Sequence, residues 1–197
     1  TKLTTFGTTV TAARSCKKCL HSVQMPESHP CVSLPTPDPA PNPRMRDFMD
    51  DPRDVYKVSD LLTRFELPAQ PHEWNCDCPP EHVELHKRTE SQSVQPGSLC
   101  ILHMKTTAVL AGHRLEESDC FVHNSKQFRA LTLVLHNGPN LRSGHYTAAF
   151  RENPDSPWMY ADDEHVTPVE GGALTSWHWK RAYYILYEVT DVVIGLD

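Results

Sequence analysis

A run of prolines at alternating positions limits the fold of this chain more than any other part of its sequence. Proline occupies positions 35, 37, 39, 41 and 43. Each proline fixes its own φ angle and lacks a backbone N–H, so the run excludes an α-helix and an interior β-strand. We therefore predict an extended connector over residues 31–44.

The composition is that of a folded domain with a mildly acidic surface. The 197 residues are 39% apolar, and 19 Lys and Arg stand against 25 Asp and Glu, for a net charge of −6. A chain of this length can bury one sizeable core. Its negative charge argues against a nucleic-acid partner and favours a basic protein partner. No segment approaches the ~20 apolar residues of a membrane span, so we expect no membrane partner.

Two close pairs stand out among the seven cysteines: Cys16 with Cys19, and Cys76 with Cys78. The first ten residues lack the pattern of a secretory signal, so these pairs predict metal ligands and a reducing compartment, the cytoplasm or the nucleus. A tetrahedral zinc site needs four thiolate or imidazole ligands, which these four cysteines would supply. Only one residue separates Cys76 from Cys78, which is short for a zinc knuckle. One of three histidines could therefore replace a member of that pair: His72, His82 or His86.

One helix is predicted between the two cysteine pairs. Val58, Leu61, Leu62 and Phe65 follow the i, i+3, i+4, i+7 pattern of a single helix face. The pattern predicts a helix over about residues 56–66, for which Ser59 is the candidate cap.

The second half of the chain has the pattern of an antiparallel sheet. Leu131, Leu133 and Leu135 alternate with less apolar positions, which predicts a strand that ends at a turn over His136–Pro139. Short connections between strands favour an antiparallel meander, and the upstream helix makes the fold class α+β. Further strands are expected over residues 4–23 (two strands around a Cys-Lys-Lys-Cys turn), 100–104, 145–150, 158–161 and 182–189.

A hairpin between residues 145–150 and 158–161 would bring a histidine beside a carboxylate. If its loop centres on Pro154, His145 faces Asp163 and Tyr146 faces Asp162. A slip of one residue would exchange the two aspartates, so the spacing leaves both open. A histidine base needs an acceptor on its second ring nitrogen, which fixes the tautomer. Gly144 leaves room beside His145 for the close approach of a backbone or a substrate.

At this point the sequence resembles the ubiquitin-specific proteases. Ser143-Gly144-His145-Tyr146-Thr147-Ala148 looks like the histidine box of that family. The segments around the box, in the same order as in the family, strengthen the resemblance: residues 133–138 before it, and Trp158, Asp162-Asp163-Glu164, Val166 and residues 182–187 after it.

Upstream, the resemblance is fainter but reaches nearly the whole chain. Cys16-Lys-Lys-Cys19 resembles the first zinc knuckle of the family's fingers, and residues 102–105 resemble a strand that the family often ends with Leu-Lys-Arg-Phe. The resemblance implies a papain-like palm with an antiparallel sheet and a zinc-ribbon-like fingers subdomain, present as a partial domain. On this view residues 1–104 are a fingers-like region and residues 105–197 a palm-like region.

The resemblance also implies an activity, the hydrolysis of the isopeptide bond after the C-terminal glycine of ubiquitin by a cysteine thiolate. His145 would be the general base, Asp162 its orienting partner and Asp163 a second acidic residue near the oxyanion. Gly144 and Tyr146 would contact the substrate, ubiquitin.

The nucleophile expected from this resemblance is missing. The family's cysteine lies in a box that ends in Gly-Asn-Thr-Cys, and no such box occurs in the sequence. We therefore expect the chain alone to be inactive and its partner to be the N-terminal half of the protease domain or a separate chain. The alternatives are an inactive ubiquitin-binding scaffold that has lost the nucleophile half, and a zinc-ribbon interaction protein unrelated to proteolysis.

Overall fold

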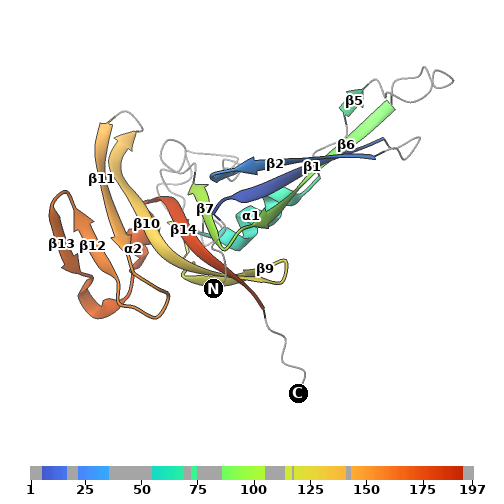
Figure 1. Ribbon diagram of the computed structural model, residues 1–197. Helices are drawn as coiled ribbons and strands as arrows, with labels where there is room; N and C mark the ends of the chain where they lie inside the picture. The colour runs from blue at the N-terminus through green and yellow to red at the C-terminus, as the bar shows by residue number, and fades with distance from the viewer. Residues whose placement is uncertain are drawn as a thin grey trace.

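Two β-sheets dominate the computed structural model (Figure 1). The structure describes residues 6–16, 22–35, 55–68, 72–74, 86–104, 114–116, 118–140 and 143–192. The larger sheet has eight strands and carries most of the second half of the chain. The smaller sheet has four strands and projects away from the larger one (Figure 1).

The eight-stranded sheet has the order β13-β12-β11-β10-β14-β7-β3, with β9 paired to β10. Neighbouring strands are antiparallel except for β3 and β7, which are parallel. This sheet and the helices packed on it confirm the predicted α+β class. Its strands are β3 (Val32–Leu34), β7 (Leu99–Met104), β9 (Cys120–His123), β10 (Lys126–Asn140), β11 (Ser143–Phe150), β12 (Met159–Asp162), β13 (His165–Pro168) and β14 (Ala182–Asp191).

The four-stranded sheet has the order β2-β1-β6-β5, and all its pairs are antiparallel. Cys16, the last residue of β1, lies opposite Arg88, which is also paired with His72 of β5. The strands are β1 (Thr8–Cys16), β2 (Ser22–His29), β5 (His72–Trp74) and β6 (His86–Pro96), and a separate parallel pair joins β4 (Val55–Tyr56) to β8 (Arg114–Leu115).

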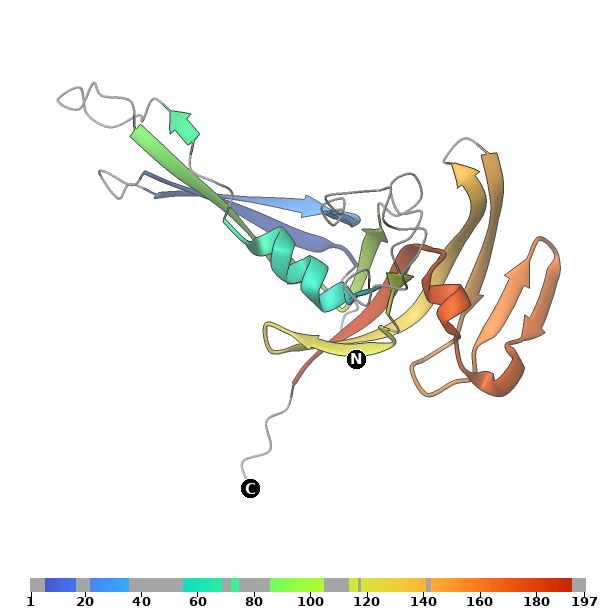
Figure 2. The same ribbon diagram turned by 180° about the vertical axis from the view of Figure 1, so that it is seen from behind.

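Two helices lie on one face of the large sheet. They are α1 (Val58–Glu66) and α2 (Ser176–Trp179), and a 3-10 turn at Glu170–Gly172 precedes α2. Figure 2, the view from behind, shows both helices in front of the strands. The main core lies between this face and the helices, and its largest fully buried side chains include Trp179, Tyr187, Phe128, Leu62, Leu102, Leu133 and Leu135. Burying such side chains contributes about 1.5–3 kcal/mol each.

The opposite face of the large sheet is apolar but only half-buried. Register places Tyr184 of β14 beside His103 of β7 and Val134 of β10, while the residues that alternate with them are in the core. Neither described helix lies on this face (Figure 1).

Two local predictions, the helix cap and the end of a strand, need correction. Helix α1 begins at Val58 with Lys57 as its N-cap, so Ser59 lies inside the first turn and is not the cap. Residues 136–139 do not end the strand, because β10 continues to Asn140 through a bulge after Asn137. A bulge accommodates Pro139, which cannot donate a regular ladder hydrogen bond.

The connector and the hairpin register also differ from expectation. Residues 32–34 of the predicted connector form the edge strand β3, and Pro35 follows its last residue. An edge strand tolerates an adjoining proline better than an interior strand does. The predicted register of the hairpin put Tyr146 opposite Asp162. The observed register is shifted by one residue from this prediction, because Ala148 pairs with Ala161.

Candidate active site

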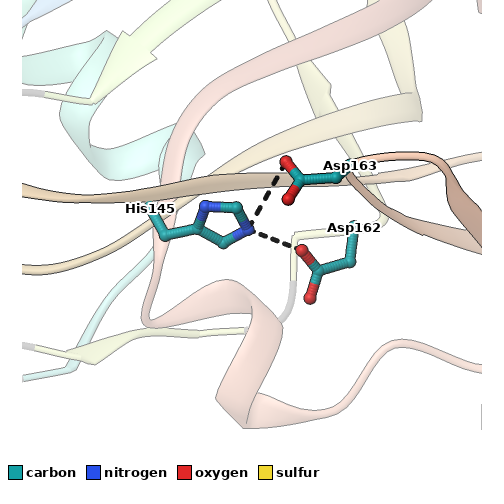
Figure 3. Close-up of side chains that lie close together, drawn as sticks. All are labelled: His145, Asp162 and Asp163. Carbon is teal, nitrogen blue, oxygen red and sulfur yellow. Dashed lines mark hydrogen bonds and ion pairs between the residues drawn. The ribbon is translucent and has the colours of Figure 1, made fainter.

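The hairpin of β11 and β12 brings His145 and Asp162 together (Figure 3). The Nε2 atom of His145 lies 2.5 Å from Oδ1 of Asp162, a short hydrogen bond between an imidazole and a carboxylate. The side chains of His145 and Asp162 project from the same face of the sheet. On β11, His145, Thr147 and Ala149 alternate with the intervening residues and therefore share one face, and Ala149 is buried in the core.

Asp163 is the more distant of the two aspartates. Its Oδ1 lies 3.9 Å from Nε2 of His145, beyond hydrogen-bonding distance. Asp163 occupies the tight turn between β12 and β13 with a φ of 50°, so its side chain leaves the strand direction that Asp162 follows. The choice between the two carboxylates, which the spacing left open, falls on Asp162 as the hydrogen-bond partner.

The pair is open to solvent. The side chains of His145 and Asp162 are 48% and 49% exposed, and that of Asp163 is 78% exposed. The hydrogen bond from His145 to Asp162 raises the pKa of the imidazole above 6.5; desolvation opposes this, and the charges of both aspartates add to it. The Nδ1 atom lies on the far side of the ring from both carboxylates (Figure 3). Among the described residues no group bonds Nδ1.

Two glycines let the β10–β11 hairpin close tightly next to His145. A β-carbon on Gly138 would lie 2.6 Å from Cα of Gly144, and one on Gly144 would lie 2.8 Å from the carbonyl oxygen of Asn137. It would also collide with Nε2 of the buried His136. No side chain fits at either position, which agrees with the close approach expected at Gly144.

Tyr146 lies on the opposite face of β11 from His145 and belongs to a row of aromatic rings. Its ring is 4.7 Å from that of His136 and 5.8 Å from that of Tyr183. Tyr183 in turn contacts Tyr184 and His103, with centroids 4.6 and 4.9 Å away. Sequence reasoning did not find the contribution of His136, Tyr183 and His103. The sequence feature that could have indicated this aromatic row is the alternation of aromatic residues with core residues in the adjoining strands.

No hydrogen bond joins His145 to any of the described cysteines, which are Cys16, Cys31, Cys100 and Cys120. Cys100 lies in the core of β7, where burial raises its pKa to about 11, as expected for a structural cysteine. Cys120 is exposed on β9, opposite Arg129. Cys16 is buried at the end of β1. Cys19, Cys76 and Cys78 lie outside the described residues, so the predicted zinc site is seen only through Cys16.

Within the described part of the chain, one group of side chains has the composition of a metal site. Ligand atoms of His145, Asp162 and Asp163 lie within 4.8 Å of one another. The same three groups make the hydrogen-bonded pair described above, which accounts for their closeness without an ion. No described helix is long and apolar enough to cross a membrane.

A histidine held by a carboxylate on antiparallel strands, beside a glycine-lined hairpin, is an arrangement of a hydrolytic site. The family model of ubiquitin carboxyl-terminal hydrolases matches residues 5–187 of this chain. The chain therefore belongs to the ubiquitin carboxyl-terminal hydrolase family, and the fold is that of a ubiquitin-specific protease catalytic domain.

Individual relatives agree with this assignment. Ubiquitin carboxyl-terminal hydrolase 14 of Caenorhabditis elegans is 36% identical over 76 residues, which cover 36% of this chain and 16% of the relative. Among solved structures, the SAGA DUB module of Ubp8, Sgf11, Sus1 and Sgf73 bound to monoubiquitin has a TM-score of 0.71 at 16% identity. The same module bound to ubiquitin aldehyde has a TM-score of 0.70 at 16% identity. In both cases the match covers 96% of this chain and 42% of the solved chain. The chain thus spans less than half of the proteins that it matches.

Proposed function

We propose that this chain supplies the general base and its orienting carboxylate to a cysteine-type deubiquitinase that hydrolyses the isopeptide bond after the C-terminal glycine of ubiquitin. The observation that carries the proposal is the bond between Asp162 and Nε2 of His145, which leaves Nδ1 for a thiol. Membership of the family supports the reaction class.

His145 would move the proton in both halves of the reaction. Its Nδ1 takes the proton from a cysteine thiol, and the thiolate attacks the glycyl carbonyl carbon. The same nitrogen then protonates the amine as the C–N bond breaks, leaving a thioester that water hydrolyses. Asp162 holds the ring by Nε2 and stabilises the imidazolium. Asp163, 3.9 Å from Nε2, adds negative charge at the edge of the site and is proposed to position groups near the oxyanion.

The ubiquitin tail is proposed to lie along the Tyr146 side of β11. Gly144 has no side chain to obstruct an extended peptide, and Tyr146 is 47% exposed. The rings of Tyr183 and Tyr184 continue the apolar surface away from the hairpin. Ubiquitin in two of the structurally similar modules supports ubiquitin as the ligand.

The nucleophile is proposed to come from a segment or chain outside these 197 residues. The sequence has no cysteine box of the family's type, and Cys100 is too deeply buried to serve. The half-buried sheet face that carries Val134 and Leu186 offers an apolar surface on which such a segment could pack. We propose the cytoplasm or nucleus as the compartment, because free thiolate chemistry needs reduced cysteine.

Hydrolysis of ubiquitin–aminomethylcoumarin tests this proposal. We expect no turnover by the chain alone and turnover after addition of the protease segment that bears the cysteine box. His145→Gln should abolish the restored activity, while Asp155→Asn, at an exposed turn, should keep it. Turnover by the chain alone, lost on Cys120→Ser, would show that the nucleophile lies within the chain.

The second candidate is an inactive ubiquitin-binding scaffold, which the absence of a cysteine box from these 197 residues also fits. A scaffold would bind ubiquitin without gaining activity from any added segment. Calorimetric titration with ubiquitin therefore separates the two: binding that His145→Gln leaves unchanged, with no restored turnover, would favour the scaffold.

A structural zinc ion in the small sheet is a further part of the proposal. Cys16 is buried where β1 ends, and β6 begins at the same end of the sheet, since Cys16 lies opposite Arg88. A buried cysteine at that end suits a thiolate site, to which Cys19, Cys76 and Cys78 would contribute. Zinc there would tie the ends of the strands together.

A further inference from the structure

A half-buried tyrosine, Tyr160, and an exposed tryptophan, Trp177, form an aromatic patch next to the candidate catalytic pair. Tyr160 lies two residues before Asp162 on β12, so both side chains project from the same face of the strand. The ring of Tyr160 lies 6.3 Å from that of Trp177 on α2 and 6.1 Å from that of His178. Trp177 is 40% exposed, although a tryptophan gains from burial.

Local contacts hold Trp177 in place despite this exposure. The backbone N–H of Thr175 donates to Nδ1 of His178 at 3.1 Å, which caps the short helix. The guanidinium of Arg181 lies 4.4 Å from the centre of the Trp177 ring and donates to the Trp177 carbonyl oxygen. An aromatic side chain that is already held in one conformation loses little conformational entropy on binding, as is typical of the anchor residues of protein interfaces.

Carboxylates lie on the Asp162 side of the patch, while the Arg181 guanidinium lies over the Trp177 ring. Asp163 and Glu164 form the turn that follows Asp162, and both are exposed. A basic polypeptide would place its charges near these carboxylates and its aliphatic stems against the rings.

The position of the patch relative to His145 indicates which part of a substrate it meets. His145 and Tyr146 are adjacent on β11 and therefore project from opposite faces. The tail of ubiquitin is proposed to follow the Tyr146 face, whereas the patch lies on the face of His145 and Asp162. The scissile bond would lie at His145, between the two surfaces, so the leaving side of the bond faces the patch.

We propose that Tyr160 and Trp177 bind the polypeptide that carries the acceptor lysine, with preference for a segment rich in basic residues. This rests on the proposed function and names the leaving-group side of its substrate. The rings would contact residues near the acceptor lysine, while Asp163 and Glu164 would pair with its basic neighbours.

Two substrates with the same ubiquitin and different leaving groups test the proposal in the protease that joins this chain to its nucleophile segment. One is ubiquitin–aminomethylcoumarin, and the other is ubiquitin linked to the lysine of a basic peptide. Trp177→Ala should lower kcat/KM for the peptide conjugate about tenfold more than for the coumarin substrate, an effect typical of an interface anchor. Val166→Ala is the matched control. Val166 is exposed on β13, on the face of the β12–β13 hairpin opposite to Tyr160, so this substitution should leave the ratio of the two kcat/KM values unchanged.

The outcomes separate this inference from the function on which it rests. Failure of both substrates in the unmodified protease would count against the proposed function. Normal turnover with an unchanged ratio in Trp177→Ala, or an equal loss for both substrates, would overturn the acceptor site.

A binding measurement on the chain itself decides the question independently of turnover. The indole N–H signal of Trp177, assigned through Trp177→Phe, should shift saturably with the basic lysine peptide and not with an acidic peptide of equal length. No shift with the basic peptide, or equal shifts with both, would overturn the proposal.

Discussion

Asp162 bonds Nε2 of His145 at 2.5 Å and holds the imidazole from the side away from Nδ1. A base held in this way presents one defined nitrogen to a reaction partner, because the carboxylate fixes the tautomer that has the proton on Nε2. The pair forms within one hairpin, so its geometry depends on the local strand register. The rest of the sheet fixes that register through the buried Ala149 and Leu133.

Replacement of Asp162 by Asn should lower the pKa of His145 towards 6.5. The main cause is that the hydrogen bond to a charged carboxylate is replaced by, at most, one to a neutral amide oxygen, and the lost charge of Asp162 acts in the same direction. Titration of the His145 ring proton by NMR in both proteins measures the shift, with Asp155→Asn as a control far from the ring. Equal pKa values in the wild type and in Asp162→Asn would contradict the role assigned to this contact.

The same substitution should change how stability depends on pH. A histidine whose pKa is raised by folding stabilises the folded state below its unfolded pKa, and this contribution disappears as pH rises through the folded pKa. Asp162→Asn should therefore lower the urea midpoint more at about pH 5.5 than at about pH 8.5. A loss that is the same at both pH values would exclude this linkage.

Gly144→Ala should destabilise the hairpin by about 1–3 kcal/mol, the usual cost of forcing a group into a packed site. The new methyl group would meet Nε2 of His136 and lie 2.8 Å from the carbonyl oxygen of Asn137. Urea unfolding of the variant measures the cost, and Ser28→Ala on the exposed strand β2 serves as a control. His136→Ala in the Gly144→Ala background should recover only part of the loss, because the backbone contact remains. An unchanged stability of Gly144→Ala would contradict the close packing of this hairpin.

Metal analysis of the purified chain should give about one zinc per chain. Cys16→Ser should lower this ratio and destabilise the four-stranded sheet, since β1 would lose a ligand at its end. Cys120→Ser, at an exposed position on β9, should leave the zinc content unchanged. A chain free of zinc, or a Cys16→Ser variant with full zinc, would contradict the site.

Sequence patterns identified the strands with clear alternation and missed features set by tertiary contacts. The run at Leu131–Leu135 and the segment at 182–189 correspond to β10 and β14, because each alternates between core and open face. Strand β13 was not expected, since all four of its residues are exposed and carry no alternation. The bulge after Asn137 also gave no sequence signal beyond two glycines, whose meaning depends on the packing of His136.

Within the candidate site, the residues were predictable but their arrangement was not. The histidine box identified His145, and the acidic pair after it gave two candidates. The choice of Asp162 depends on the turn that starts at Asp163, where a positive φ redirects the side chain. The aromatic neighbours Tyr160 and Trp177 come together only because α2 packs against the sheet, which no local pattern encodes.

Glu66 joins the two sheets, and its removal should loosen their connection. It ends α1, where the helix dipole disfavours a carboxylate, yet it accepts three hydrogen bonds there. The donors are the backbone N–H of Val94 in β6 at 2.7 Å, Nε2 of His123 at 2.8 Å and Nδ2 of Asn124 at 3.0 Å. The side chains of Glu66 and His123 are only 16% and 10% exposed, so water cannot readily replace these bonds.

Glu66→Ala should therefore cost about 2–3 kcal/mol, because it leaves a largely buried imidazole and a strand N–H without their acceptor. Hydrogen exchange at the Val94 amide should accelerate, while exchange at amides in the centre of β10 and β14 should change little. Glu27→Ala is the matched control, since Glu27 is 72% exposed and makes only a 3.5 Å ion pair with His29. If Glu66→Ala were as stable as Glu27→Ala and the Val94 amide stayed protected, this contact would not hold the small sheet to the large one.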